Sequence, residues 1–259
     1  MISIVMTYYN RINLLRHTLR TIEPYNESDF EIVIVDDFSN EEHSLKNIQD
    51  EFHSLKIRII EMKSEVSEKW YRNPCIPFNI GLRKSLGDKI IIQNPECCHL
   101  GNIIQYTQNH LTNENYLSFH CYATGPEDTK RIHAGKKIRY NDMPIKQAKD
   151  LDSKWYNHEL FRPASYNFAT AISRENLKKL NGFDERYALG HNCDDDDFIH
   201  RVKKLNLKID FVKEPYVIHQ YHGIGVSSLM TQPLADNRAL WKKLKDFDYI
   251  KAPNEIDIE

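Results

Sequence analysis

The sequence predicts an α/β fold with a mostly parallel sheet, flanked by helices, that binds its ligand at one edge. Short apolar segments rich in β-branched residues alternate with segments whose apolar residues recur at helical spacing. Strands that alternate with helices in this way form βαβ units, which place the strands in parallel. Polar residues follow three of the expected strands, at the end where open α/β sheets bind ligands.

The first hundred residues carry the clearest pattern. We expect strands at 2–6, 31–35, 56–61 and 89–93, and helical segments at 12–22, 45–52 and 77–86. The segment 12–22, for example, places Leu15, Leu19 and Ile22 on one helical face. Its spacing therefore predicts an amphipathic helix that packs on the sheet.

The rest of the chain is less regular, and residues 116–174 give the weakest pattern. The apolar segment 168–172 leads into a helix with Leu177 and Leu180, and two strands are expected at 207–212 and 215–219. Trp241 and Leu244 indicate a terminal helix. The acidic end, residues 254–259, is expected to be frayed.

Composition excludes several classes of protein. The chain has 259 residues, a formal net charge of −2 and no long apolar stretch, so neither a nucleic-acid-binding field nor a membrane span is expected. The N-terminus lacks the pattern of a secretory signal. The five cysteines show no zinc-site spacing, and reduced thiols in a cytoplasmic protein are the simplest explanation.

Glycine-rich phosphate-binding motifs are absent from the sequence. Neither G-x-G-x-x-G nor G-x-x-x-x-G-K-[ST] follows an expected strand. The three polar clusters, at 7–11, 36–40 and 94–99, would instead converge at the carboxyl ends of the strands. The sheet is therefore expected to be neither an ordinary dinucleotide fold nor a P-loop domain, which disfavours an ATPase.

The most unusual stretch lies late, at residues 181–201. It opens with a Gly-Phe-Asp-Glu turn and reaches four consecutive aspartates, 194–197, at the expected start of a helix. One explanation is a helix cap, because the helix dipole favours acidic residues there. A cap needs only one acidic side chain, however, and crowded carboxylates raise one another's pKa. A carboxylate with a raised pKa is suited to act as a general base near neutral pH.

These segments resemble a known family. The start of the chain, SIVMTYYNR followed by EIVIVDDFSNEE, is similar to the N-terminal half of family 2 glycosyltransferases, which have the GT-A fold and use nucleotide sugars. The late stretch GFDERYALGHNCDDDDFIHR resembles the acceptor-side motif of these enzymes and the C-terminal domain of galactosyltransferases. The resemblance covers roughly residues 1–225. It implies a nucleotide-sugar-binding half at 1–100, an acceptor-binding and catalytic half at 101–228, and a C-terminal helix and tail at 229–259.

The resemblance implies a donor site at the first strand ends. Thr7, Tyr9, Asn10 and Arg11 match the base-binding segment, while Asp36 and Asp37 match an acidic pair that contacts the base or ribose. Carboxylates accept hydrogen bonds from such groups, although Asp36 could also simply shape its turn. Arg72 and the weaker candidate Asn79 match a region near the diphosphate. Arg72 could equally be a solvated surface residue.

The metal motif departs from the family pattern. Family members carry Asp-x-Asp, which holds Mg²⁺ or Mn²⁺, whereas this chain has Asn94-Pro95-Glu96. Both Asn94 and Glu96 offer oxygen ligands, which hard divalent cations prefer. His219, with His222 second, matches a family histidine that closes on the metal. A divalent cation, Mn²⁺ or Mg²⁺, is therefore expected, but the altered motif leaves the requirement for it open.

The resemblance also assigns the acidic run. Counting back from Arg201 makes Asp195 the general base, with Asp194 as an acceptor contact and Asp196 as a further candidate. Asp197 lies furthest along the helix and is expected to tolerate replacement best. Trp155 and Tyr156 are weak candidates for an acceptor site, and burial in a core is at least as probable.

Together these features predict an inverting glycosyltransferase. It would move a sugar from a nucleotide sugar, a UDP-sugar by expectation, to a hydroxyl of a glycan or lipid-linked glycan. We expect it in the cytoplasm, at the membrane surface only through its acceptor. Two alternatives remain: a nucleotide-sugar-binding module that has lost turnover, which the missing Asp-x-Asp favours, and a nucleotidyltransferase.

Overall fold

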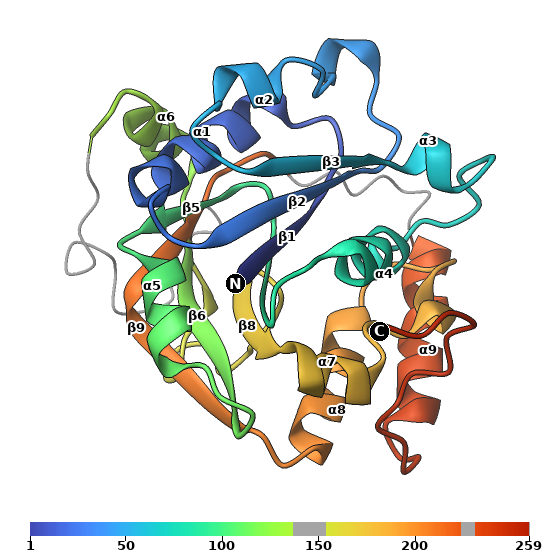
Figure 1. The fold of residues 1–259 in the computed structure, drawn as a ribbon. Coiled ribbons are helices and arrows are strands. Elements are labelled where there is room, and N and C mark those ends of the chain that lie inside the picture. The colour runs from blue at the N-terminus through green and yellow to red at the C-terminus, as the bar shows by residue number, and fades with distance from the viewer. Residues whose placement is uncertain (137–153, 224–230, 259) are drawn as a thin grey trace.

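The structure, a computed structural model, describes residues 1–136, 154–223 and 231–258 (Figure 1). Within this part of the chain, one nine-stranded sheet has the order β3-β2-β1-β4-β8-β6-β9-β5, with β7 paired to β6. The strands are β1 (Ile2–Tyr8), β2 (Phe30–Asp36), β3 (Ile57–Glu61), β4 (Lys89–Gln93), β5 (Cys97–Leu100), β6 (Asn115–Ala123), β7 (Lys154–Asn157), β8 (Ala169–Ser173) and β9 (Lys208–His219).

Helices cover both faces of this sheet (Figure 1). The α-helices are α1 (Ile12–Ile22), α2 (Ile48–Glu51), α3 (Met62–Glu65), α4 (Cys75–Lys84), α5 (Ile103–His110), α6 (Pro126–His133), α7 (Arg174–Leu180), α8 (Asp194–Lys204) and α9 (Thr231–Leu244). Short 3₁₀ helices are η1 (Glu23–Tyr25), η2 (Glu41–His43) and η4 (Glu185–Tyr187). No helix in the described ranges combines the length and the hydropathy that a bilayer crossing requires.

The first half of the sheet confirms the predicted βαβ arrangement. β1 pairs in parallel with β2 and with β4, and β2 pairs in parallel with β3. Each expected strand of this half is present to within two residues at either end. The carboxyl ends of β1, β2 and β4 consequently lie at the same edge of the sheet.

The second half is mixed and matches the sequence less closely. β8 is antiparallel to β4 and β6, whereas β9 is parallel to β6 and antiparallel to β5. The two strands expected at 207–212 and 215–219 are one strand, β9, whose register with β6 shifts between Phe119 and Cys121. The domain boundary expected between residues 228 and 229 lies outside the described residues.

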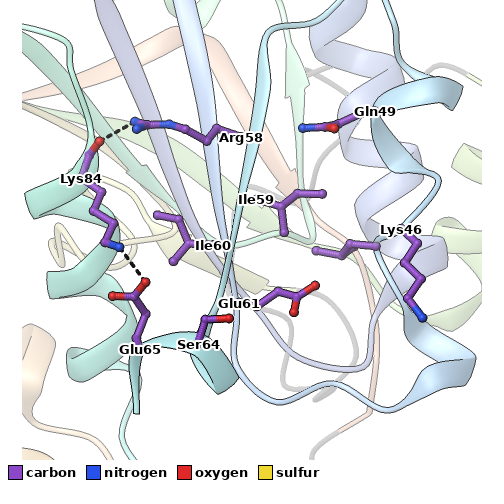
Figure 2. A pocket seen from close by; sticks show the side chains of 10 residues that line it. Lys46, Gln49, Arg58, Ile59, Ile60, Glu61, Ser64, Glu65 and Lys84 are labelled. Atoms are coloured by element: carbon purple, nitrogen blue, oxygen red, sulfur yellow. Dashed lines mark hydrogen bonds and ion pairs between the residues drawn. The ribbon is translucent and has the colours of Figure 1, made fainter.

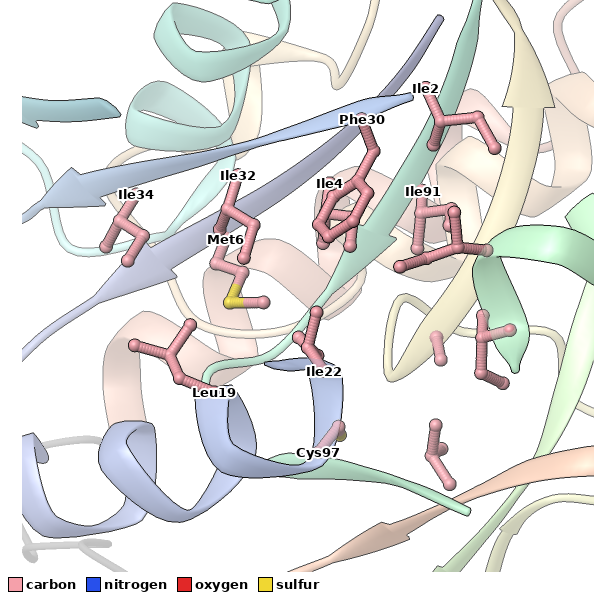
Figure 3. Close-up of a cluster of buried hydrophobic side chains, with 14 of the residues drawn as sticks. Ile2, Ile4, Met6, Leu19, Ile22, Phe30, Ile32, Ile34, Ile91 and Cys97 are labelled. Carbon is pink, nitrogen blue, oxygen red and sulfur yellow. The ribbon is translucent and has the colours of Figure 1, made fainter. Parts of the chain in front are cut away.

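Alternate residues of the central strands enter two separate cores. Ile4 and Met6 of β1 face α1 and join a cluster with Leu19 and Ile22, as Figure 3 shows. Val5 faces the opposite side, where α4, α7 and α8 pack. This period-two division is what a strand buried on both faces requires, and it explains the continuous apolar runs in the sequence.

The C-terminal segment is packed, so the expectation of a frayed end is wrong. Ile258 is 3% exposed and Ala252 is 1% exposed. The side chain of Asn254 donates to the carbonyls of Asn181 and Phe183, and the Ile258 amide donates to the Asn181 side chain. The segment thus supports the Gly-Phe-Asp-Glu turn, in which Asn181 and Gly182 both adopt positive φ.

Candidate active site

Polar segments from three strand ends meet in a cleft of about 480 Å³. This volume is in the range of small-molecule and cofactor sites. The lining residues come from the ends of β1, β2 and β4 and from the segment before α4: Thr7, Tyr8, Tyr9, Arg11, Asp37, Lys69, Arg72, Pro74, Phe78, Asn94, Pro95, Glu96 and His191. The predicted convergence of the polar clusters is therefore present in the fold.

One end of the cleft combines an aromatic ring with a carboxylate. The Tyr71 hydroxyl donates to Asp37 Oδ1 at 2.6 Å, and Lys69 Nζ lies 2.6 Å from Oδ2. Burial raises the pKa of Asp37, and the bonds from Lys69 and Tyr71 offset only part of this effect. Tyr9 is 52% exposed, and Lys69 Nζ lies over its ring, 4.8 Å from the ring centroid. An exposed ring beside an acceptor of hydrogen bonds is suited to a planar base.

Two predicted donor-site residues shape the loops instead of lining the cleft. The Asn10 side chain accepts from the Asn40 amide, and the Asn10 amide donates to the Ser39 hydroxyl. Asp36 Oδ1 accepts from the Ser39 amide and faces a neighbouring cavity of about 230 Å³. These contacts hold the loops after β1 and β2 together, so Asn10 and Asp36 position the residues that do line the cleft.

Arg72 and Asn79 have different placements. The Arg72 and Asn73 amides both donate to the Ala188 carbonyl, which leaves the exposed Arg72 side chain at the cleft. Asn79 is fully buried: its amide donates to the Phe183 carbonyl and its oxygen accepts from the Phe183 amide. Asn79 therefore joins α4 to the Gly-Phe-Asp-Glu turn, and the structure does not bring it into the cleft.

A buried carboxylate at the other end of the cleft gathers three cationic or imidazole groups. Glu96, 2% exposed, accepts from Arg11 Nη1 at 2.6 Å and lies 3.2 Å from Nε2 of both His219 and His222. Burial alone would raise the pKa of Glu96, but the bonds from His219 and His222 and the charge of Arg11 outweigh it, so the pKa lies well below its usual range. Glu96 is therefore held as the charged carboxylate.

The same group fits a divalent cation. The ligand atoms of Glu96, His219 and His222 lie within 4.8 Å of one another, and Glu96 Oε2 is buried with no hydrogen-bond partner among the described residues. A carboxylate with two imidazoles is a mixed oxygen and nitrogen donor set. Asn94 lines the cleft nearby, and its backbone carbonyl accepts from the Cys97 amide. His99, by contrast, is buried and bonded to Gln93, as a structural histidine is.

The acidic run begins α8, but its four carboxylates have four different environments. Asp194, 7% exposed, accepts from the buried Asn73 side chain at 2.9 Å. Asp196 accepts from the Tyr166 hydroxyl at 2.5 Å. Asp195 is partly exposed and accepts from the neighbouring Asp196 backbone amide at 3.0 Å. Among the four, Asp195 is thus the carboxylate that has solvent access and, within the described part of the chain, no bond from another side chain.

The pKa of Asp195 also distinguishes it from an ordinary helix cap. Burial raises its pKa well above the usual value, and the charges of Asp194 and Asp196 raise it more. Burial also raises the pKa of Asp194, which the bond from Asn73 partly offsets. A carboxylate with an elevated pKa and an accessible face can accept a proton near neutral pH.

Asp197 corrects the expectation that it would tolerate replacement best. It is fully buried, its Oδ2 lies 2.7 Å from Nε of the buried Arg201, and it accepts from the Tyr249 hydroxyl. Arg201 in turn donates to the carbonyls of Leu180 and Gly182. The pair therefore holds the turn that precedes the acidic run.

The two aromatic candidates for the acceptor site, Trp155 and Tyr156, have different environments. Trp155 is 2% exposed and belongs to a core cluster with Tyr122, so the expectation that it lines an acceptor site is wrong. Tyr156 is half-buried, and its ring packs edge-on against the ring of His219 at 4.9 Å. Tyr156 therefore lies beside the Glu96 group.

Four residues of the site escaped the sequence analysis: Lys69, Tyr71, Asn73 and Tyr166. Each lies in a segment without regular periodicity and contacts a carboxylate at least 30 residues away. Asn73 directly follows the predicted residue Arg72. No pattern within the sequence links it to Asp194.

A second cavity, of about 460 Å³, lies beside the edge strand β3 and away from these groups (Figure 2). Lys84 is bonded to Glu65, and Arg58 is bonded to the Lys84 carbonyl and to Glu31. Lys84, Glu65 and Arg58 are thus already engaged in ion pairs. This cavity shows no cluster of groups suited to chemistry.

Family models cover most of the chain. A model described as glycosyl transferase family 2 matches residues 3–172, and one described as the N-terminal domain of galactosyltransferase matches residues 165–223. A sequence search of curated proteins found no significant match.

Solved structures share the fold. TarS residues 1–349 of S. aureus with UDP-GlcNAc align with a TM-score of 0.58 at 15% identity, over 88% of this chain and 60% of that one. Glucosyl-3-phosphoglycerate synthase of Mycobacterium tuberculosis with Mn²⁺ and UDP-glucose gives 0.53 at 15% identity, over 86% and 72%. A mannosyltransferase of Pyrobaculum calidifontis with GDP-mannose and Mn²⁺ gives 0.54 at 14%, over 86% and 58%. Identities this low establish the fold alone.

Proposed function

Since the chain belongs to glycosyl transferase family 2, we propose that it is an inverting enzyme that transfers a sugar from a UDP-sugar to an acceptor hydroxyl. The observation that carries the proposal is that the site contains two carboxylates whose environments shift their pKa in opposite directions. Asp195, whose pKa is raised, stands at an accessible position, while Glu96, whose pKa is lowered, lies among Arg11, His219 and His222. The first suits proton removal and the second suits a cation beside a diphosphate.

The donor would bind with its base at the Tyr9 and Asp37 end of the cleft. Tyr9 offers a ring for stacking, Asp37 accepts a hydrogen bond from a base N–H, and Thr7 lines the same cleft. Arg72 and Lys69 add positive charge along the path of the diphosphate. Arg11, bonded to Glu96, is the third cation of the cleft.

A divalent cation fits Glu96, His219 and His222, with Asn94 as a further oxygen donor. When bound, such an ion supplies positive charge that stabilises a departing diphosphate. Asp195 accepts the proton of the acceptor hydroxyl, whose oxygen then forms a bond to the anomeric carbon from the face opposite the diphosphate. The bond from that carbon to the diphosphate oxygen breaks, and UDP leaves. Attack from the opposite face inverts the configuration.

A panel of nucleotide sugars, each with and without Mn²⁺, tests the proposal. Release of free UDP from one donor, slow without acceptor, is the expected result, and Asp195→Asn serves as the inactive control. NMR of the product anomer then decides between inversion and retention. A retained anomer would remove Asp195 as the base of a single displacement.

The replacement of Asp-x-Asp by Asn94-Pro95-Glu96 favours one alternative function, a module that binds a nucleotide sugar without turnover. UDP binding by calorimetry with no UDP release from any donor would favour that module. Pyrophosphate formation from a nucleoside triphosphate and a sugar phosphate would favour a nucleotidyltransferase instead.

A further inference from the structure

Arg162 lies between the acidic run and the Glu96 group, and no acidic partner for it is found among the described residues. The Arg162 guanidinium carbon is 5.6 Å from the ring centroid of Tyr156 and 5.4 Å from that of Tyr166. Tyr166 donates to Asp196, and Tyr156 packs on His219. Arg162 is therefore joined through one ring to the acidic run and through the other to the Glu96 group, and none of these three side chains lines the donor cleft.

The position of Arg162 is fixed by its backbone. Its carbonyl accepts from the His158 amide at 2.9 Å, and its amide donates to the His158 carbonyl at 3.1 Å. The side chain is half-buried, with its charge over the faces of two rings. Such stacking orients a guanidinium but leaves its N–H donors unused.

The positive charge of Arg162 has no counter-charge among the described residues. Two buried or partly buried arginines near the site, Arg11 and Arg201, are each bonded to a carboxylate within 2.7 Å, whereas Arg72 is exposed. Among the described residues, no carboxylate lies within ion-pair distance of Arg162, although Asp195 and Asp196 stand nearby on α8. A half-buried guanidinium without a counter-charge is unfavourable unless a ligand supplies one.

We propose that Arg162 is an anion-binding element of the acceptor site and that the acceptor carries a phosphate or carboxylate group near the hydroxyl that receives the sugar. The inference rests on the proposed function and specifies its acceptor. Arginine presents a planar fork of donors that matches either group. The surrounding aspartates repel an anion, so Arg162 supplies the attraction that lets one approach.

Binding of three probes of similar size tests the inference: glycerol 3-phosphate, glycerate and glycerol. Each is titrated by NMR into the protein loaded with UDP, both with and without Mn²⁺. We expect the two anionic probes to bind and glycerol not to bind detectably. Their relative affinities show whether phosphate or carboxylate is preferred.

Arg162→Gln should weaken both anionic probes at least about tenfold, because a charge-assisted hydrogen bond is lost. Arg131→Gln is the matched control, since Arg131 is an exposed arginine of α6 paired with Asp128, and it should leave all affinities unchanged. UDP affinity and melting temperature report whether each variant is folded. Should Arg162→Gln not fold, Arg162→Lys retains the charge without the planar fork and is expected to bind glycerol 3-phosphate more weakly than the parent.

Three outcomes would overturn the inference: equal probe affinity in parent and variant, glycerol binding as tightly as the anions, or anion binding that needs Mn²⁺ and survives Arg162→Gln. The last would place the anion on the metal. UDP release from a nucleotide sugar without acceptor separates the two proposals. If the parent releases UDP but shows no anion preference, only the acceptor inference fails; if it never releases UDP, the transferase itself fails.

Discussion

The site contains two groups of carboxylates that differ in their neighbours. Glu96 is surrounded by Arg11, His219 and His222, and its pKa lies well below the usual range. The aspartates at the start of α8 are surrounded by one another, and the pKa of Asp195 lies well above it. Burial alone would raise the pKa of both Glu96 and Asp195. The sign of the neighbouring charge therefore decides whether a buried carboxyl stays ionised or holds a proton.

The two environments suit the same functional group, a carboxylate, to two different roles. A carboxylate that stays charged is suited to hold a cation, whereas one that gains a proton easily is suited to act as a base. Within the acidic run the contrast appears again, since Asp197 is neutralised by Arg201 and Asp195 is not. Substitutions that remove each charge in turn test whether the environments act as described.

Asp195→Asn should have the largest effect on activity. We expect the transfer rate to fall by about 10²–10⁴, the usual contribution of general base catalysis, while UDP affinity is retained. Stability at neutral pH should be unchanged or raised, because a disfavoured charge is removed. Rates and melting temperatures of Asp195→Asn and Asp196→Asn are compared directly. A larger loss of rate for Asp196→Asn would assign the base to Asp196.

Asp197→Asn should have the largest effect on stability. It leaves the buried Arg201 without its counter-charge, which typically costs about 3–5 kcal/mol. Asp196→Asn is the matched control, because it changes one partly exposed hydrogen bond and should cost about 0.5–1.5 kcal/mol. Urea unfolding measures both values. Equal losses would mean that the ion pair adds nothing specific.

Glu96→Gln should weaken Mn²⁺ binding. Loss of a residue that merely supports a ligand already costs roughly 10–100-fold in affinity, so loss of the carboxylate should cost at least as much. Calorimetric titration with Mn²⁺ measures this independently of activity, and His99→Gln serves as a control for a buried histidine outside the group. Unchanged Mn²⁺ affinity would leave Arg11 as the cation that faces the diphosphate.

Asp37→Ala should weaken UDP binding by roughly tenfold or more, since a hydrogen bond to a charged group is worth about 1.5–3 kcal/mol. Asp36→Ala is the control, because Asp36 faces the neighbouring cavity. Titration of both variants with UDP distinguishes them. A greater loss for Asp36→Ala would mean that the base lies in the smaller cavity.

Asp194→Asn should shift the pH profile of transfer. Because Asp195 must be deprotonated to act, the rate rises with pH through its raised pKa and then levels. Removing the Asp194 charge lowers that pKa, so the midpoint should move to lower pH. Stability follows the same linkage: in the unfolded chain Asp195 ionises near its usual pKa of about 3.9, so the folded state loses stability as pH rises from there to the raised pKa. The variant should lose less over this interval, and a pH series of rates and unfolding curves measures both.

Much of the first half of the fold could be predicted from the sequence. Its strands are buried on both faces, which produces continuous apolar runs such as 31–35, and the segment after β1 shows regular helical spacing. β5, β6 and β7 were not predicted. β6 is fully buried yet includes Asn115, Ser118 and His120, so it shows neither an apolar run nor an alternation.

The candidate site was predicted where a motif lies within one segment. The acidic run, Glu96 and the residues after β1 and β2 were found this way. Asn73, Tyr166 and Arg162 were not, because each acquires its role from a partner distant in sequence. Trp155 failed for a related reason, since an aromatic residue in an irregular segment gives no sign of whether it faces a core or a ligand.

The pairing of β5 with β9 has a consequence for the folding pathway. Among the described strands, β5 pairs only with β9, and in that pairing Cys97, next to Glu96, is the register partner of His219. Closing such a long loop is slow compared with forming the local βαβ contacts of the first half. We expect the parallel block, which emerges first during synthesis, to fold before this pairing forms. Glu96 and the histidines would then meet only after β9 has been inserted between β6 and β5, so a nascent or partly folded chain would lack the proposed cation site.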